Sequence, residues 1–253
     1  MQVDHTDGDD EPSRSAEAPT PSGPKSSGAP PGREADTGPA DASVRVSSAL
    51  THRADVEAVN RRYAIDQGYE RIQEIEDKTV TPAMRRIEAE DPERHLVGLN
   101  NRLKGKDRLT EKVVNAMAEQ PGLTCANAFA LVKDGIRYTF QYKDDRYTEG
   151  VYADCERLAE AGFELLERRG TWETENYKGI NSRWRVPETS QLFEVQFHTY
   201  ASYEAKQETH AAYEKLRDPT TPRDEQDRLV EYQRKVNSRV PTPPGAAEIP
   251  DYP

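Results

Sequence analysis

Residues 193–199 read FEVQFHT, a strict alternation of apolar and polar positions. Side chains of a β-strand point to opposite faces at a period of two. One face of this predicted strand is therefore apolar and consists of Phe193, Val195 and Phe197. The other face carries a carboxylate, an amide and an imidazole, from Glu194, Gln196 and His198. The apolar face is typical of a strand anchored in a core, whereas the polar row suits either a solvated face or a functional site.

The same reading of periodicity predicts the other elements of the chain. Apolar residues at helical spacing favour a helix over 55–80, with an inner face of Val56, Val59, Tyr63, Ile72 and Ile75. Further helices are predicted after Thr81-Pro82 and at 108–119, 124–132, 147–161, 202–217 and 222–238. Residues rich in aromatic and β-branched side chains predict strands at 135–142, 163–172, 180–186 and 192–199. This order predicts an α+β domain in which a mixed β-sheet of about five strands is flanked by helices.

The two ends of the chain differ from its middle. Residues 1–50 contain no aromatic residue and are rich in Pro, Ser and Gly, and their acids outnumber their bases. Such a segment buries too little apolar surface to offset the entropy of ordering, so we expect an acidic disordered tail over 1–50. The sequence PTPPGAAEIPDYP predicts a second disordered tail at 241–253. One compact domain is expected over 51–240.

Charge and hydropathy exclude some classes of protein. The formal net charge is −11, so a broad nucleic-acid-binding surface is not expected, and any grip on phosphate must come from a local cluster. The sequence contains no apolar run of membrane-spanning length. It also shows no signal peptide, which favours a cytoplasmic protein, or a secreted one if a leader has been removed. Cys125 and Cys155 are interpreted as two small thiols in preference to a disulfide.

A basic cluster lies in NRLKGKDRLTEKV, residues 101–113. Its cations are Arg102, Lys104, Lys106, Arg108 and Lys112. Arg108 and Lys112 are four residues apart on one predicted helix face, and the other cations lie near the start of that helix. Several fixed cations suit a polyphosphate, and the alternative is a solvated basic helix face.

Acidic residues near two predicted strands suggest a metal site. Asp134 precedes the strand GIRYTF, which contains Arg137, and Glu194 lies in the polar row. Mg²⁺ bound to nucleotide phosphates takes one or two protein carboxylates, so Asp134 and Glu194 are candidate metal ligands. The alternative for Asp134 is a turn or cap aspartate.

Two further segments combine cations with aromatic residues. YKGINSRWR, residues 177–185, contains a glycine that allows close backbone approach to a ligand. In KQETHAAYEKLR, polar residues recur on one helical face at Lys206, His210, Tyr213 and Arg217. The alternative for this helix is a salt-bridged outer face.

Taken in order, the blocks RLKGKDRLTEK, DGIRYT, YKGINS, FEVQFHT and K…TH resemble the synthetase domain of the RelA/SpoT superfamily. The resemblance covers roughly residues 95–217 and implies a nucleotidyltransferase-like fold. It also implies that the β,γ-pyrophosphate of ATP is transferred to the 3′-hydroxyl of a nucleotide with Mg²⁺ as cofactor. The stand-alone branch, which includes ATP nucleotide 3′-pyrophosphokinases, is the most similar, and no hydrolase domain is visible.

The resemblance also implies roles for individual residues. ATP phosphates are expected to contact Arg102, Lys104, Arg108 and Lys112, and the adenine is expected to pack on Arg137. Glu194, Asp134 and Gln196 are the expected catalytic residues, with Asp134 and Glu194 holding the metal. The acceptor nucleotide is expected to contact Lys178, Ile180, Trp184, His198, Lys206 and His210.

Four positions depart from the family pattern. Arg108 replaces the usual serine, and His198 replaces an arginine that is frequent in alarmone synthetases. Asp134 lies three residues before Arg137, whereas the family's metal aspartate is typically five before. Ile180 replaces an aromatic residue that stacks on guanine, and stacking contributes about 1–3 kcal/mol per base. We therefore expect a weakened guanine preference, with products of the (p)ppApp or (p)ppGpp type.

The predicted function is that of an ATP:nucleotide 3′-pyrophosphotransferase that uses a purine nucleotide as acceptor. Two alternatives stay open from the sequence. One is a catalytically silent nucleotide-binding regulatory module, and the other is a toxin that pyrophosphorylates RNA 3′ ends. The carboxylates Glu194 and Asp134 favour the enzyme over the silent module.

Overall fold

The computed structural model describes residues 39–253, with side chains from residue 52 onward. The chain divides into two units, residues 1–50 and 51–253, and the second contains every predicted site residue. Helix α1 runs over Pro39–Ile75. Of the segment predicted to be disordered, residues 1–38 thus lie outside the described residues and residues 39–50 are helical. The correction has a local cause, because Pro39 suits a first helical turn and residues 40–50 contain no further Pro or Gly.

The sheet confirms the predicted fold class. Its strands are β1 (Arg94–Val97), β2 (Arg137–Tyr142), β3 (Glu164–Gly170), β4 (Ile180–Val186) and β5 (Gln191–Thr199), in the order β1-β2-β5-β4-β3. The central pair β2–β5 is parallel, and the other three pairs are antiparallel. Strand β1 was not predicted, since its four residues RHLV are too few to show a period.

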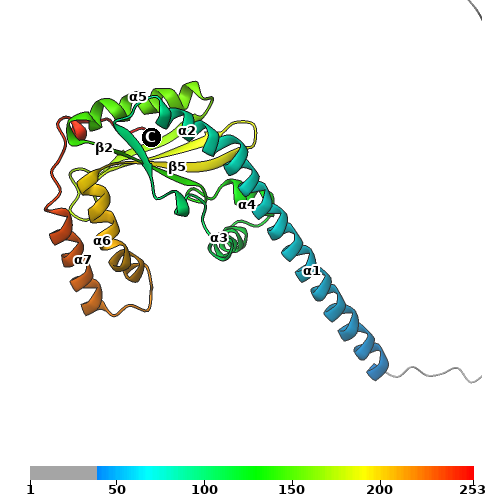
Figure 1. Ribbon diagram of the computed structural model, residues 1–253. Coiled ribbons are helices and arrows are strands. Elements are labelled where there is room, and N and C mark those ends of the chain that lie inside the picture. Colours follow the sequence, from blue (N-terminus) through cyan, green and yellow to red (C-terminus); the bar gives the residue numbers. More distant parts are fainter. Residues whose placement is uncertain (1–38) are drawn as a thin grey trace, which may run out of the picture. The chain divides into compact units, whose positions relative to one another are not determined.

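The helices cover both faces of the sheet. They are α2 (Thr81–Ala89), α3 (Lys106–Glu119), α4 (Cys125–Ala130), α5 (Tyr147–Glu160), α6 (Tyr200–Leu216) and α7 (Arg223–Asn237), with a π-helical turn at Glu76–Val80. Helices α2 and α5 lie on one side of the sheet, and α3 and α6 lie on the other (Figure 1). Aromatic and aliphatic side chains fill the first side, among them Phe140, Phe193, Val195 and Phe197, all 0% exposed.

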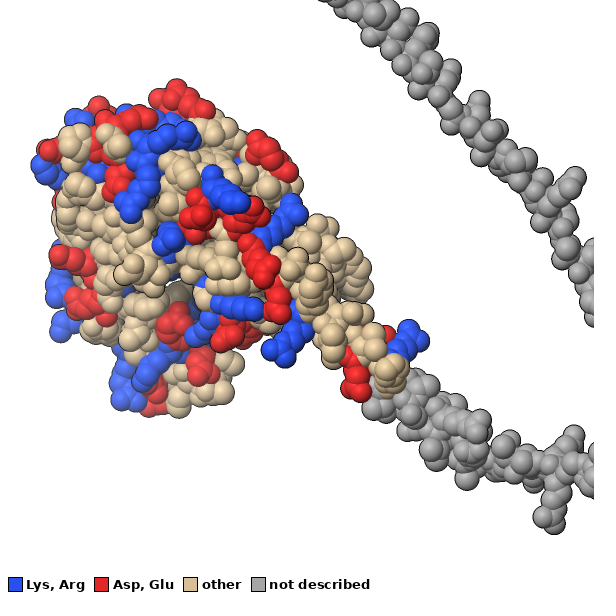
Figure 2. Space-filling model, turned by 45° about the vertical axis from the view of Figure 1, so that its right-hand side comes forward, with Lys and Arg blue, Asp and Glu red and all other residues tan. Residues whose placement is uncertain are grey.

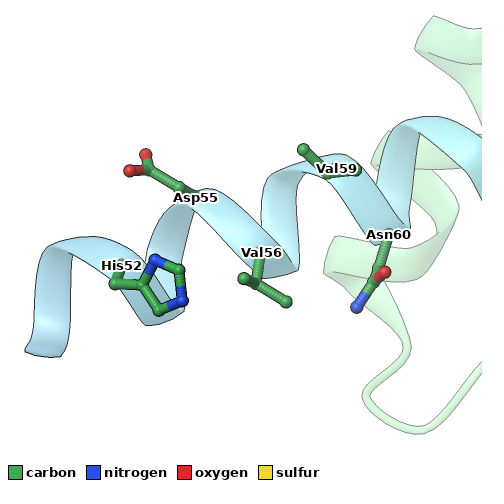
Figure 3. Close-up of a pocket in the computed structure, with 5 residues that line it drawn as sticks. All are labelled: His52, Asp55, Val56, Val59 and Asn60. Carbon is green, nitrogen blue, oxygen red and sulfur yellow. The ribbon is translucent and has the colours of Figure 1, made fainter.

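The apolar face predicted for the first helix is only half correct. Ile72 and Ile75 are buried in the core, but Val56, Val59 and Tyr63 are 45%, 67% and 66% exposed. Val56 and Val59 line a hollow together with His52, Asp55 and Asn60 (Figure 3). All five lining residues belong to α1, so this hollow brings no second element near and contains no predicted site residue.

Residues 241–253 belong to the compact unit and are not a loose tail. Ala246 and Ile249 are 1% and 5% exposed and join the core. Tyr252 pairs with Arg168 of the edge strand β3, and the Asp251 carboxylate accepts a hydrogen bond from the Gly170 N–H at 2.8 Å. The prediction was wrong because it rested on the proline content. Two apolar residues of this segment enter the core, and the segment pairs with an edge strand that otherwise lacks a partner on that side.

Two further predictions concern sulfur and membranes. Cys125 and Cys155 are both free thiols, with Cys155 buried and Cys125 partly exposed. Among the described residues, no helix combines the length and the apolar character needed to cross a membrane.

Candidate functional site

The polar face of β2 and β5 gathers the predicted catalytic residues. Parallel pairing sets Arg137 beside Glu194 and Thr139 beside Gln196. On the other side of β5, Asn181 of β4 pairs with Gln196. Because alternate residues share a face, these side chains lie together on the side of the sheet opposite the aromatic core. We call Glu194, Gln196 and His198 the polar row.

Glu194 is a partly buried carboxylate without an ionic partner. Burial raises the pKa of its carboxyl, and the charge of Asp134 adds to the rise. The hydrogen bond from Gln196 and the charge of Arg137 oppose it. Within residues 52–253, neither Glu194 nor Arg137 forms an ion pair. A carboxylate held in this way has an oxygen available to a ligand, and the guanidinium of Arg137 is available to an anion.

Asp134 lies in the turn before β2 and is held by two lysines. The Lys112 ammonium of α3 donates to its carboxylate at 2.6 Å, and the Lys104 ammonium lies 3.4 Å away. Burial acts to raise the pKa of Asp134, but these two cations outweigh it and lower the pKa. The charge of Asp134 also reaches Glu194. Asp134, with Lys104 and Lys112, therefore lies near enough to the polar row for its charge to act on Glu194.

The donor set suits magnesium better than a fully protein-bound metal. Within the described part of the chain, no group of three or more His, Cys, Asp or Glu side chains is arranged to hold a metal ion. Asp134 and Glu194 offer carboxylate oxygens, which Mg²⁺ prefers, and Mg²⁺ commonly needs only one or two of them beside substrate phosphates. The residues fit the predicted Mg²⁺ on this chemical ground.

Not every cation of the basic cluster belongs to this site. The Arg102 guanidinium donates to the buried Glu76 carboxylate at 2.7 Å. Lys106 pairs with Asp66 of α1 at 2.6 Å. The Arg108 side chain is 70% exposed and lies 3.7 Å from Glu214, which links α3 to α6. Of the predicted ATP-contacting residues, Lys104 and Lys112 thus contact Asp134 and Arg137 lies beside Glu194, whereas Arg102 is engaged in a structural ion pair.

Gln196 connects Glu194 to helix α6. Its amide nitrogen donates to Glu194 Oε1 at 3.0 Å. Its amide oxygen accepts hydrogen bonds from the Lys206 ammonium and from the Thr139 hydroxyl, the latter at 3.2 Å. Burial and the charge of Arg137 lower the pKa of Lys206 to about 8, although Glu194 acts in the opposite direction.

His198 is a buried, neutral member of a hydrogen-bonded chain. One ring nitrogen lies 2.8 Å from the Tyr177 hydroxyl, and the other lies 2.8 Å from the Ser202 hydroxyl. Burial, aided by the charge of Lys206, lowers its pKa well below the ordinary value. Gly179 packs against this ring, because a Cβ there would lie 2.9 Å from His198 Cε1. Direct contact between His198 and an acceptor is not supported, since the side chain is 0% exposed.

Ile180 and Trp184 do not face the site, which corrects their predicted role. Ile180 is 0% and Trp184 is 1% exposed, and they pair with Phe197 and Phe193 on the core side of the sheet. The expectation of a weakened guanine preference rested on Ile180 and loses that basis. The error arose because the family motif identifies a position in the sequence, whereas strand alternation decides which face of the sheet that residue occupies.

Two other predicted acceptor contacts have side chains that are engaged elsewhere or exposed. The Lys178 ammonium donates to the Trp172 carbonyl at 2.6 Å. His210 is exposed on α6, one turn beyond Lys206. The helical face predicted from Lys206, His210, Tyr213 and Arg217 therefore leads from the site into solvent, where Arg217 lies over the Tyr213 ring.

Sequence reasoning missed several residues of the site. Thr139 and Asn181 face the polar row from the neighbouring strands. Tyr203 of α6 lies edge-on to His198, with ring centroids 6.1 Å apart, and Tyr177 does the same at 5.4 Å. Alternation within 135–142 and 180–186 was the signal that could have found Thr139 and Asn181. The two tyrosines depend on a helix and a loop whose placement the pattern does not give.

Figure 2 shows basic and acidic side chains interspersed over the face in view, which agrees with the net negative charge of the sequence.

No family model matches the chain. A search of curated proteins also finds no match.

Solved structures do match the chain. A GTP pyrophosphokinase family protein from Streptococcus pneumoniae is 16% identical, covers 68% of this chain and 85% of its own, and has a TM-score of 0.45. The Type VI effector Tas1, solved with its immunity protein, is 18% identical over 70% of this chain and 95% of that chain, with a TM-score of 0.46. Small alarmone synthetase 1 from Bacillus subtilis, solved with its product pppGpp, is 13% identical over 74% and 92%, with a TM-score of 0.39.

The names of these structures include a GTP pyrophosphokinase family protein and a small alarmone synthetase, but TM-scores below 0.5 carry no argument about this chain. The observed fold, an α+β domain with a five-stranded mixed sheet, agrees with the fold class predicted from the sequence. Similarity at these identities concerns the fold and does not transfer an activity, so the function must be argued from the residues of the site.

Proposed function

We propose that this protein transfers the β,γ-pyrophosphate of ATP to the 3′-hydroxyl of a purine nucleotide, giving AMP and a nucleotide 3′-pyrophosphate. The observation that carries the proposal is Glu194, a partly buried carboxylate beside Arg137 that has no ionic partner among the described residues. The order of the five sequence blocks supports the same reaction.

Cations near Glu194 support a polyphosphate donor. Lys104 and Lys112 reach the same carboxylate, that of Asp134, from different segments. With ATP bound, these two ammonium groups and the Arg137 guanidinium would neutralise charge on the phosphates. Asp134 and Glu194 would hold Mg²⁺, which would supply further charge neutralisation at the phosphate oxygens.

Glu194 would act on the acceptor. Its carboxylate would accept, or orient, the proton of the 3′-hydroxyl while that oxygen attacks the β-phosphorus of ATP and AMP departs. Burial raises the pKa of Glu194, which brings the group closer to the working pH of a general base. The remaining catalysis would come from positioning and electrostatic stabilisation, as in other phosphoryl transfers.

The test is an assay with ATP, Mg²⁺ and a panel of acceptors that includes ATP, GTP, GDP and a short RNA. Anion-exchange chromatography should detect AMP together with one pyrophosphorylated acceptor. If neither product forms with any acceptor, the proposed enzyme is rejected. Product on the RNA alone would favour a toxin that acts on RNA 3′ ends.

A matched variant separates the enzyme from a silent nucleotide-binding module. Glu194→Gln keeps the size and the polarity of the side chain but removes the carboxylate. The enzyme should lose turnover while ATP binding, measured by calorimetry, stays within about threefold, a difference smaller than one hydrogen bond. A silent module should show no turnover before or after the change.

A further inference from the structure

The amide of Gln196 is buried, and both its oxygen and its nitrogen have hydrogen-bond partners. The residue is 6% exposed, so its oxygen and nitrogen need partners inside the protein. The oxygen accepts from Lys206 and from Thr139, and the nitrogen donates to Glu194 Oε1. The three partners come from α6, β2 and β5, which means that the amide joins three elements at the site.

Lys206 fixes the direction of this amide. The two ends of a glutamine amide are nearly equal in shape, so hydrogen bonding decides which end points where. A protonated lysine can only donate, and the amide oxygen must therefore face Lys206. The amide N–H₂ then faces the carboxylate of Glu194. A reversed amide would set an oxygen against that carboxylate, without a hydrogen bond and with electrostatic repulsion.

We propose that Gln196 is a positioning residue that holds one oxygen of Glu194, and that Lys206 acts on the reaction by orienting Gln196 instead of binding the acceptor. This proposal rests on the function proposed above. With Oε1 of Glu194 engaged by Gln196, Oε2 is the oxygen left to face the acceptor hydroxyl. The reactive carboxylate is then set by a chain of contacts that starts on α6.

The surroundings of Lys206 agree with an internal role. Its ammonium lies 5.5 Å from the centre of the Tyr203 ring, on the preceding turn of α6. The charged and titratable groups that face it from the sheet are Arg137 of β2 and Glu194 and His198 of β5. Lys206 thus lies between an amide oxygen and an aromatic ring, and its side chain is partly buried.

The kinetic test uses Gln196→Met, Lys206→Met and the double variant. Each single change should lower kcat about tenfold, as expected for loss of a hydrogen bond to a charged group, and should leave both KM values within about twofold. The double variant should be no slower than Gln196→Met, because Lys206 acts through the amide. Lys206→Arg keeps a cationic donor and should restore kcat to within about threefold of the wild type.

Gln191→Met is the matched control. It removes another buried glutamine amide from β5, one that donates to the Phe129 carbonyl on the core side. It should lower stability without changing kcat. Two results would overturn the proposal: a raised acceptor KM with unchanged kcat in Lys206→Met, or losses in kcat that multiply in the double variant.

A second measurement keeps the proposal testable apart from the reaction. The side-chain amide of Gln196 gives a ¹H–¹⁵N NMR signal that is identified by its loss in Gln196→Met. Lys206→Met should move this signal, and an unmoved signal would overturn the orienting role. Absence of turnover in the wild type would reject the proposed function, whereas the NMR result would still decide the role of Lys206.

Discussion

Two carboxylates in this molecule are buried in opposite ways. Asp154 of α5 lies on the core side of the sheet with Arg94, Tyr142 and Arg157, and we call these four residues the α5 cluster. Glu194 lies on the other side of the sheet, in the polar row. Burial raises the pKa of both carboxyls. Asp154 nevertheless has two arginine partners, whereas Glu194 has an amide and no ion pair within residues 52–253.

The difference teaches which buried charge is structural. Arg94 and Asp154 are both 0% exposed, and the Arg94 guanidinium also donates to the Ile87 carbonyl. Removing one member of such a pair leaves the other charge unpaired in the interior. Glu194 leaves no stranded partner when its charge is removed. We therefore expect the α5 cluster to determine stability and the polar row to determine activity.

The largest expected effect is on activity, in Glu194→Gln. Loss of a general base lowers rates by about 100- to 10,000-fold, so kcat should fall within that range. The free energy of unfolding should stay equal or rise, because a buried charge without a partner is removed. Initial rates by chromatography and urea unfolding give the two numbers. A stability loss above about 2 kcal/mol would place Glu194 in the same structural class as Asp154.

The next effect is on stability, in Asp154→Asn. The substitution keeps the shape of the side chain but leaves Arg94 and Arg157 without a counter-charge, and we expect a loss of about 3–5 kcal/mol. Urea unfolding measures it. Asp145→Asn, at an exposed position, should change stability by no more than about 0.5 kcal/mol. Equal values for the two variants would show that burial of the α5 cluster carries no energetic weight.

Ile180→Tyr tests whether residue 180 lies on the core face of the sheet or on the face of the polar row. Because Ile180 packs on the core side, the larger side chain should overpack the core and cost about 1–3 kcal/mol. The ratio of kcat/KM for ATP and GDP as acceptors should stay unchanged. Ile180→Val is the control and should cost about 0.5–1.5 kcal/mol. A shift of the ratio toward GDP with intact stability would return residue 180 to the acceptor site.

Period-two alternation carried most of what the sequence could predict. It separated Phe193, Val195 and Phe197 from the polar row correctly, since a face follows from local geometry alone. It was not applied to Ile180 and Trp184, where a family motif was followed instead. Alternation could not predict the ion pairs of Arg102 and Lys112, because these pairs depend on how distant segments meet. For the same reason no sequence pattern predicted the α5 cluster, in which Arg94 and Asp154 lie 60 residues apart.

The smallest expected effect is a pH dependence that comes from Lys206. Burial and Arg137 depress the pKa of its ammonium from the ordinary lysine value to about 8, so the charged form is present below that pH and is lost as pH rises through it. A neutral amine no longer has to donate, and Gln196 is then oriented only by its contacts with Glu194 and Thr139. The kcat of the wild type should fall roughly fivefold across this limb, the equivalent of about 1 kcal/mol for one hydrogen bond. Lys206→Arg stays charged and should move the limb to higher pH, which a kcat–pH profile measures. An unmoved limb would assign the titration to another group and would make the contact between Lys206 and Gln196 a structural one, like those of the α5 cluster.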